Sequence, residues 1–207
     1  MRTVMRHAVV MGGSMAGLLA ARVLSEYFQH VTLVERDVLG DPPEARQGVP
    51  QGRHAHVLLA RGEQILSRLF PGLTSDLVSG GAFAGDMGST LRWFQFGGYK
   101  RQHCWGHNTF IQTRPYLEWH VRRRVLALPN VKLLAGCSVT GLLPERGVVI
   151  GVQTQSAAIP GDFTVDCTGR GSAAPRWLKA MGFGAPEESS IEIDVGYASR
   201  YYRRVPE

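Results

Sequence analysis

The feature that most constrains this fold lies in the first 35 residues. An apolar run at 9–11 precedes the segment Gly12-Gly13-Ser14-Met15-Ala16-Gly17, and a second apolar run at 31–34 precedes Glu35. Apolar residues at 18, 19, 23 and 24 recur between them at helical spacing. A strand, a tight turn, a helix, a second strand and an acid in this order form the layout of a dinucleotide-binding βαβ unit. The sequence therefore predicts an α/β fold built on a parallel sheet.

Individual positions in this segment support the same interpretation. Gly12 allows a sharp turn out of the first strand, and Gly17 lets the helix press against the sheet. Ser14 stands where the fingerprint usually has its second glycine, and its hydroxyl is expected to bond a ligand or the free amides of the helix. Glu35 follows 18 residues after Gly17, near the distance expected of a carboxylate that binds ribose hydroxyls.

A signal peptide is the competing interpretation of the same residues. Basic residues at 2 and 6, an apolar stretch and small residues at 20 and 21 resemble one. However, Gly12, Gly13 and Ser14 interrupt the apolar stretch, and the strand at 31–34 needs the first strand as its neighbour. We therefore favour the strand. No run is long and apolar enough to span a bilayer.

The charge balance is basic, with a net charge of +6 at pH 7. The densest runs are Arg122–Arg124 and the arginines at 200, 203 and 204. Such runs can bind nucleic acid or an acidic partner. Solvated helix and strand faces explain them more simply, and cationic side chains also suit an anionic cofactor. We therefore expect no nucleic-acid partner.

Cysteine usage points to a reducing compartment. Cys104, Cys137 and Cys167 are odd in number and far apart, so the pattern predicts neither a disulfide framework nor a zinc site. His103 and His107 flank Cys104, but no second ligand group stands at a metal spacing. A cytoplasmic protein without a metal is expected.

The remaining elements follow from periodicity. Helical spacing predicts helices over 54–70, 115–128 and 173–181. Alternating and aromatic residues within 80–113 predict strands of a second, antiparallel sheet. Further strands are predicted at 131–134 and 137–142, and residues 148–154 and 158–166 are predicted to form a hairpin that leads to a buried strand. Strict alternation predicts a half-buried strand over 191–202.

With these elements placed, the sequence resembles the group A FAD-dependent monooxygenases, the p-hydroxybenzoate hydroxylase type. Besides the glycine-rich segment with Glu35-Arg36, three features carry the resemblance. They are Gln112-Thr113-Arg114-Pro115-Tyr116-Leu117-Glu118, Cys137–Leu142, and Val165-Asp166-Cys167-Thr168-Gly169-Arg170-Gly171-Ser172. Thr168 departs from the family pattern, which commonly has Asp there; the turn depends more on Gly169. The segment 48–56 looks like that of flavin-dependent oxidoreductases of secondary metabolism.

The resemblance implies FAD as cofactor and NADPH or NADH as reductant. It implies hydroxylation or epoxidation of a small organic substrate through a flavin C4a-hydroperoxide, in a protein that positions the cofactor. Gln51, Arg53, His54 and His56 are candidates to approach the isoalloxazine, or else they cap a helix start. The implied cofactor-binding residues are Gly12, Gly13, Ser14, Met15, Ala16, Gly17, Glu35, Arg36, Arg46, Arg114, Val139, Asp166 and Gly169.

The resemblance covers only the N-terminal portion of such an enzyme, since the later Gly-Asp motif is absent. It divides the chain into FAD-binding segments at 1–79 and 114–185 and substrate-domain segments at 80–113 and 186–207. Three hypotheses follow: a flavin monooxygenase, a truncated FAD-binding module or half of a split enzyme, and an NAD(P)-binding dehydrogenase. Exposed sheet edges would favour a homodimer or a C-terminal partner chain. The features at 112–118 and 166–171 disfavour a simple dehydrogenase.

Overall fold

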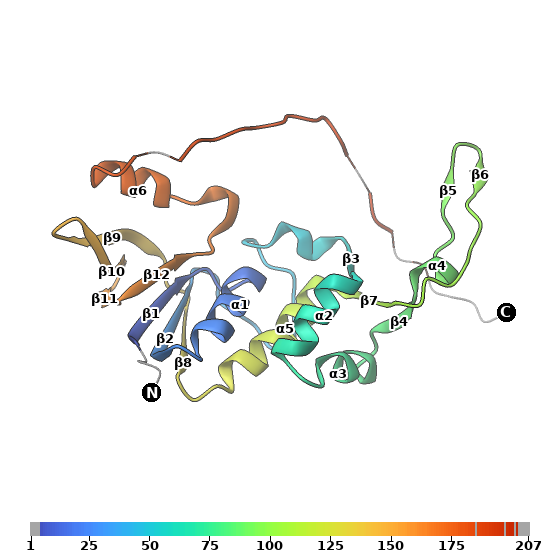
Figure 1. Ribbon diagram of the computed structural model, residues 1–207, viewed down its shortest axis with the longest axis horizontal. Coiled ribbons are helices and arrows are strands. Elements are labelled where there is room, and N and C mark those ends of the chain that lie inside the picture. The colour runs from blue at the N-terminus through green and yellow to red at the C-terminus, as the bar shows by residue number, and fades with distance from the viewer. Residues whose placement is uncertain (1–4, 185, 197, 201, 203–207) are drawn as a thin grey trace.

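A computed structural model describes residues 5–184, 186–196, 198–200 and 202. Its centre is a four-stranded parallel sheet in the order β12-β1-β2-β8 (Figure 1). The strands are β1 (Met5–Met11), β2 (Phe28–Glu35), β8 (Val131–Ala135) and β12 (Phe163–Asp166). Apolar runs in β1 and β2 are buried on both faces, as a covered parallel sheet requires. The predicted α/β fold class is confirmed.

Two helices cover one face of this sheet. They are α1 (Met15–Leu24) and α5 (Arg114–Leu126), which also contact each other. Ala8 and Val10 of β1 pack there against Leu18 of α1 and Val121 of α5, all fully buried. This cluster is the larger apolar core, and burial of such side chains is the main driving force of folding.

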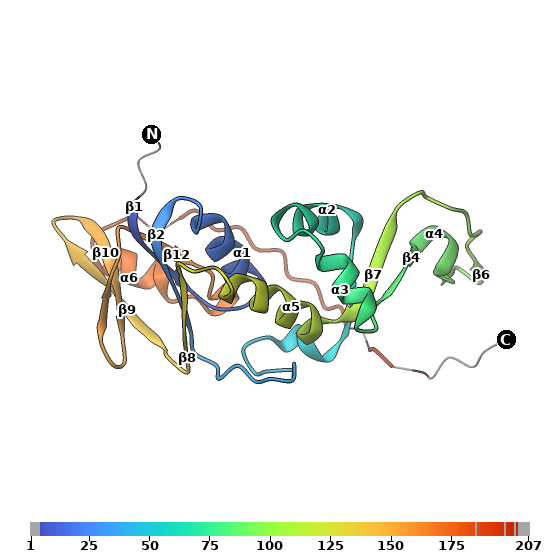
Figure 2. The ribbon, with the colours of Figure 1, turned by 90° about the horizontal axis from the view of Figure 1, so that it is seen from below.

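An antiparallel meander covers the opposite face. It consists of β9 (Val139–Glu145), β10 (Val148–Thr154) and β11 (Ala158–Pro160), in the order β11-β10-β9. Val9, Met11 and Val34 of the parallel sheet form a second apolar cluster with Val152. After β12, the short turn η2 (Gly169–Gly171) leads to α6 (Ala174–Ala180). Figure 2 shows the sheet between these two layers.

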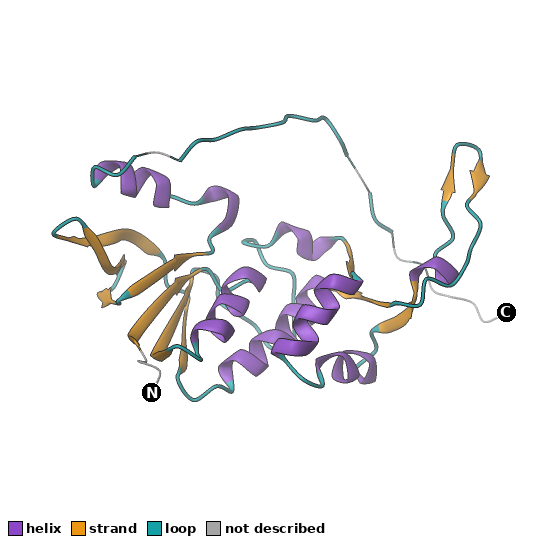
Figure 3. Ribbon diagram, viewed as in Figure 1, coloured by secondary structure: helices purple, strands orange, loops and turns teal. Residues whose placement is uncertain are grey.

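A second antiparallel sheet lies beyond α5. Its order is β3-β7-β4, with β3 (Ala55–Leu58), β7 (Asn108–Thr113) and β4 (Phe83–Asp86). Helices α2 (Ala60–Leu69) and α3 (Leu73–Ser79) connect β3 to β4, and the 3-10 turn η1 (Pro50–Arg53) precedes β3. The short helix α4 (Met87–Thr90) leads to a protruding hairpin of β5 (Phe94–Gln95) and β6 (Gly98–Tyr99) (Figure 3). The predicted antiparallel strands within 80–113 are confirmed.

The helix predicted over 54–70 is wrong in its first part. Residues 55–58 form β3, which pairs with β7, and the helix α2 begins at Ala60. The apolar residues at 57 and 58 are compatible with both helical and strand periodicity, and pairing with the distant strand β7 favours the strand.

The strand predicted over 191–202 is also wrong for the residues that the structure describes. Residues 191–196, 198–200 and 202 form no strand, and Ile191 and Ile193 are 91% and 75% exposed. A strand needs the hydrogen bonds of a neighbour, and none of the described strands pairs with this segment. The predicted domain boundaries stay a prediction. Within the described residues, no helix is both long and apolar enough to cross a membrane.

Candidate functional site

The carboxyl ends of the parallel strands meet at one edge of the sheet. Met11 stands in register with Val34 on β2 and with Asp166 on β12. The chain leaves β1 toward β2 on one side, while β12 lies on the other side. Such a reversal of strand order is where ligands bind in open α/β sheets.

The glycine-rich turn at this edge tolerates no side chain at two positions. Gly12 has φ +98, and a Cβ atom there would lie 2.6 Å from the carbonyl oxygen of Cys167. A Cβ atom on Gly17 would lie 1.7 Å from the carbonyl oxygen of Gly12. The turn is therefore held tightly between α1 and the turn after β12.

Ser14 is the N-cap of α1, but its hydroxyl forms no hydrogen bond with the amides of the helix. It donates to Oε2 of Glu118 on α5 at 2.6 Å, and no side chain caps the helix. The first-turn amides, including those of Met15 and Ala16, keep the capacity to bind an anion such as a phosphate.

Glu35 ends β2 with only 5% of its surface exposed. Its Oε2 accepts a hydrogen bond from the Gly13 amide at 2.7 Å, and its Oε1 accepts one from the Asp37 amide at 2.9 Å. An ionised carboxylate offers about four acceptor positions, so two remain. The prediction that Glu35 binds a ribose stays untested.

Arg46, one of the cofactor-binding residues that the resemblance implies, lies beside three carboxylates, and its cofactor role stays a prediction. Its Nη1 lies 2.7 Å from Asp37 and 3.3 Å from Glu35, and its Nη2 lies 2.8 Å from Glu118. Burial lowers the pKa of its guanidinium, but hydrogen bonds to Glu118 and Asp37 outweigh burial and raise the pKa overall. Arg46 is thus a fixed cation inside this cluster.

Glu118 is the residue of the site that sequence reasoning missed. It is 5% exposed and accepts hydrogen bonds from Ser14 and from both Nε and Nη2 of Arg46. The available signal was its position between Leu117 and Val121 on the buried side of α5, because a buried acid is normally paired. Glu118 connects α5 to the glycine-rich turn and to the loop that carries Arg46.

Arg114 begins α5 and is the less satisfied cation. Its Nη2 donates to the Ser14 hydroxyl at 3.3 Å, its Nε lies 3.8 Å from Glu118, and that Nε has no hydrogen-bond partner among the described residues. Burial lowers its pKa, and the charge of Glu118 opposes that shift. An anion at the start of α1 would supply the missing partner.

A hollow of 390 Å³ lies beside this cluster, at the end of the second sheet. His56 of β3 and Gln112 of β7 stand in register and both line it. Both polar atoms of the Gln112 amide are buried without a hydrogen-bond partner. Burial, and then the charge of Arg114, lowers the pKa of His56, so that its ring is neutral near pH 7. Gln51 and Arg53 are exposed and His54 is half-buried.

The other predicted residues lie around the same edge without forming one cluster. Arg36 is exposed beside Asp37, and Val139 begins β9 against the second apolar cluster. Asp166 ends β12 and accepts hydrogen bonds from the amide and hydroxyl of Thr168, so threonine is accommodated there. Gly169 has φ +80, which explains the need for glycine.

No group of three or more metal-ligating side chains occurs within the described part of the chain. Cys104, Cys137 and Cys167 are free.

Comparison with known proteins finds relatives that this chain matches over part of their length. No protein-family model matches the chain. Protein Rv3254 of Mycobacterium tuberculosis is 38% identical over an alignment of 218 residues, which covers 95% of this chain and 45% of that protein. Glycine oxidase of Pseudomonas putida is 36% identical over 74 residues, covering 36% of this chain and 20% of that enzyme. The chain thus spans less than half the length of these curated relatives.

Solved structures share the fold at low identity. PqsL of Pseudomonas aeruginosa, a probable FAD-dependent monooxygenase, matches with a TM-score of 0.65 and 14% identity over 84% of this chain and 46% of that chain. The oxygenase of 2-methyl-3-hydroxypyridine-5-carboxylic acid matches with a TM-score of 0.55 and 21% identity over 77% of this chain and 38% of that chain. These matches show a Rossmann-like fold of the kind that FAD-dependent monooxygenases use.

Proposed function

We propose that this chain is the cofactor-binding part of an FAD-dependent oxidoreductase of the group A monooxygenase type. The observation that carries the proposal is the cluster at the carboxyl edge of the sheet. There an uncapped helix start, the carboxylate of Glu35 and the unsatisfied guanidinium of Arg114 converge. These are the three kinds of group that a dinucleotide requires.

The adenosine diphosphate part of FAD has matching groups in this chain. The first-turn amides of α1, from Met15 to Gly17, and the Arg114 guanidinium suit the pyrophosphate. The remaining acceptor positions of Glu35 suit the adenosine ribose, with Arg36 and Val139 beside the adenine. Gly12, Asp166 and Gly169 shape the turns on either side.

The 390 Å³ hollow lined by His56 and Gln112 supports a flavin over a nicotinamide as the resident cofactor. The unpartnered amide of Gln112 can donate to and accept from a polar ring edge, and His56 beside it is a neutral donor or acceptor. FAD supplies the redox chemistry when it is bound. We further propose NADPH or NADH as reductant, a small organic substrate for hydroxylation or epoxidation, and a cytoplasmic location.

A truncated module or half of a split flavoenzyme is the second candidate. β12 is an edge strand of the parallel sheet, and the Thr164 hydroxyl on it is buried without a hydrogen-bond partner. A largely apolar hollow of 420 Å³ lies beside β12, between Phe163, Leu178 and Phe183. Unpaired strand edges beside apolar surface favour a partner chain or a homodimer.

The decisive experiment is the visible absorption spectrum of the purified chain, titrated with FAD. A shifted, saturable flavin spectrum supports the proposal, and Glu35→Gln should weaken binding about tenfold or more by removing a charged acceptor. Glu44→Gln is the matched control, because Glu44 is exposed and lies two residues before Arg46 in the same loop. Absence of binding by a folded chain would contradict the first candidate. Binding without NAD(P)H oxidation would favour the second.

A further inference from the structure

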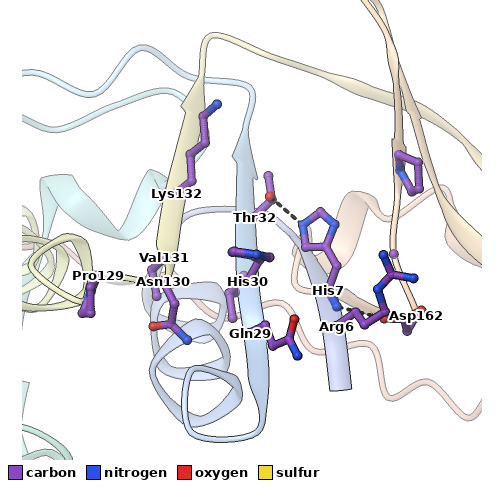
Figure 4. Close-up of a pocket in the computed structure, with 13 residues that line it drawn as sticks. Arg6, His7, Gln29, His30, Thr32, Pro129, Asn130, Val131, Lys132 and Asp162 are labelled. Carbon is purple, nitrogen blue, oxygen red and sulfur yellow. Dashed lines mark hydrogen bonds between the residues drawn. The ribbon is translucent and has the colours of Figure 1, made fainter. Parts of the chain in front are cut away.

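Another hollow lies at the amino ends of the strands of the parallel sheet, remote from the glycine-rich turn. Its volume is 630 Å³, within the range of small-molecule sites. Figure 4 shows that its floor comes from the starting residues of β1, β2 and β8. Pro160, Gly161 and Asp162, which connect β11 to β12, form one side of it.

The floor is polar on a sheet face that is otherwise apolar. His7 lies two residues before Val9 on β1, Thr32 two before Val34 on β2, and Lys132 two before Leu134 on β8. Side chains two residues apart share a face, and Val9, Val34 and Leu134 pack under the meander. The meander therefore leaves uncovered a row of polar side chains on the same face of the sheet. This row consists of His7, His30, Thr32 and Lys132.

Basic groups stand side by side in this row. His7 is in register with His30, and their rings lie 6.5 Å apart, while Lys132 is in register with Thr32. Arg6 lies on the β1 side (Figure 4). Neither Arg6 nor Lys132 has a hydrogen bond or ion pair with another described residue. Two cationic side chains and two imidazole rings therefore line this hollow together.

The hollow has a single carboxylate among its described lining residues, and it is already engaged. Oδ2 of Asp162 accepts a hydrogen bond from the His7 amide at 2.8 Å. The Asn130 amide donates to the carbonyl groups of Ser25 and Phe28. The His7 ring is fixed by a 2.8 Å hydrogen bond between Nε2 and the hydroxyl of Thr32, which is only 8% exposed.

We propose that this hollow binds a small organic oxyanion, a phosphate or a carboxylate, between Lys132, His30, His7 and Arg6. The anion accepts charge-assisted hydrogen bonds from these groups. This site is independent of the dinucleotide proposal.

The test is a titration of the chain with inorganic phosphate and, separately, with succinate, at constant ionic strength set by chloride. The ring signals of His7 and His30 should shift in a saturable manner in NMR spectra, and the melting temperature should rise. Saturation by phosphate alone identifies a phosphate site, and saturation by succinate identifies a carboxylate site.

The double variant His30→Gln/Lys132→Met should bind the anion at least about tenfold more weakly. Lys179→Ala, an exposed cation on α6, is the matched control and should bind as the unaltered chain does. If the double variant does not fold, the anion titration of the unaltered chain decides, since a bound anion must shift the ring signals of both His7 and His30 in a saturable manner. Equal responses to chloride, or no saturable shift, would overturn the proposal.

Discussion

Replacement of Glu118 by alanine tests the ion-pair cluster that holds the glycine-rich turn. The side chain is 6% exposed and accepts three hydrogen bonds, two of them from the cation Arg46. Removing one member of a buried ion pair typically costs about 3–5 kcal/mol, because the partner charge is left uncompensated. Arg46 would keep Asp37 at 2.7 Å and Glu35 at 3.3 Å, so the cost should fall at the low end, about 3 kcal/mol.

Glu118→Gln separates the charge from the side-chain volume. The amide oxygen can still accept from Arg46, while its NH₂ group can donate to the Ser14 oxygen, so a loss of about 1–2 kcal/mol is expected. The free energy of unfolding should be measured by urea denaturation, with an unchanged slope as evidence that only the native state is affected. Glu44→Ala is the control and should stay within about 0.5 kcal/mol of the unaltered chain. A loss below about 1 kcal/mol for Glu118→Ala would refute the reasoning.

Three further predictions follow from other sites. Gly17→Ala should lower the free energy of unfolding, measured by urea denaturation, by about 1–3 kcal/mol or more, because its Cβ would lie 1.7 Å from the Gly12 carbonyl oxygen. The same variant should abolish the FAD-induced spectral shift. Asp86, whose pKa is lowered to about 2 chiefly by the Trp105 amide, should order residues 103–107 at neutral pH. That ordering is complete above the unfolded pKa of about 3.9 and lost as pH falls through about 2, and hydrogen exchange of Asp86→Asn should reproduce the loss. Burial, followed by the charge of Arg124, lowers the pKa of His120, so its NMR titration should have a midpoint below about 6.5, and acidification through this range should destabilise the fold.

Local patterns predicted the parts of the fold that depend on neighbouring residues. The strand, turn, helix and strand from β1 to β2 lie within one short segment, and the helical spacing of apolar residues in α5 is visible in its own sequence. β3 was missed because its strand pairing with β7 joins residues more than fifty positions apart. The alternating segment after 190 has strand periodicity, but periodicity alone supplies no partner for its backbone.

The candidate site was predictable in its backbone and less so in its side chains. Gly12 and Gly17 follow from what a tight βαβ turn requires, and Glu35 stands at the end of β2, where the sequence predicts an acid, while its ribose-binding role stays a prediction. The bond between Ser14 and Glu118 joins residues 104 positions apart, and no local rule indicates it. Arg46 was recognised as a cation for the site, but its three carboxylate partners depend on the tertiary arrangement of two loops and α5.

The contact between Gly12 and Cys167 also fixes an order of events during synthesis. The turn that begins 12 residues into the chain packs against the turn after β12, which leaves the ribosome about 155 residues later. Synthesis at about 5–20 residues per second separates the two by roughly 10–30 seconds. The nascent β1 strand must therefore wait with one edge unpaired, which makes this apolar strand a point where chaperones or premature association would act.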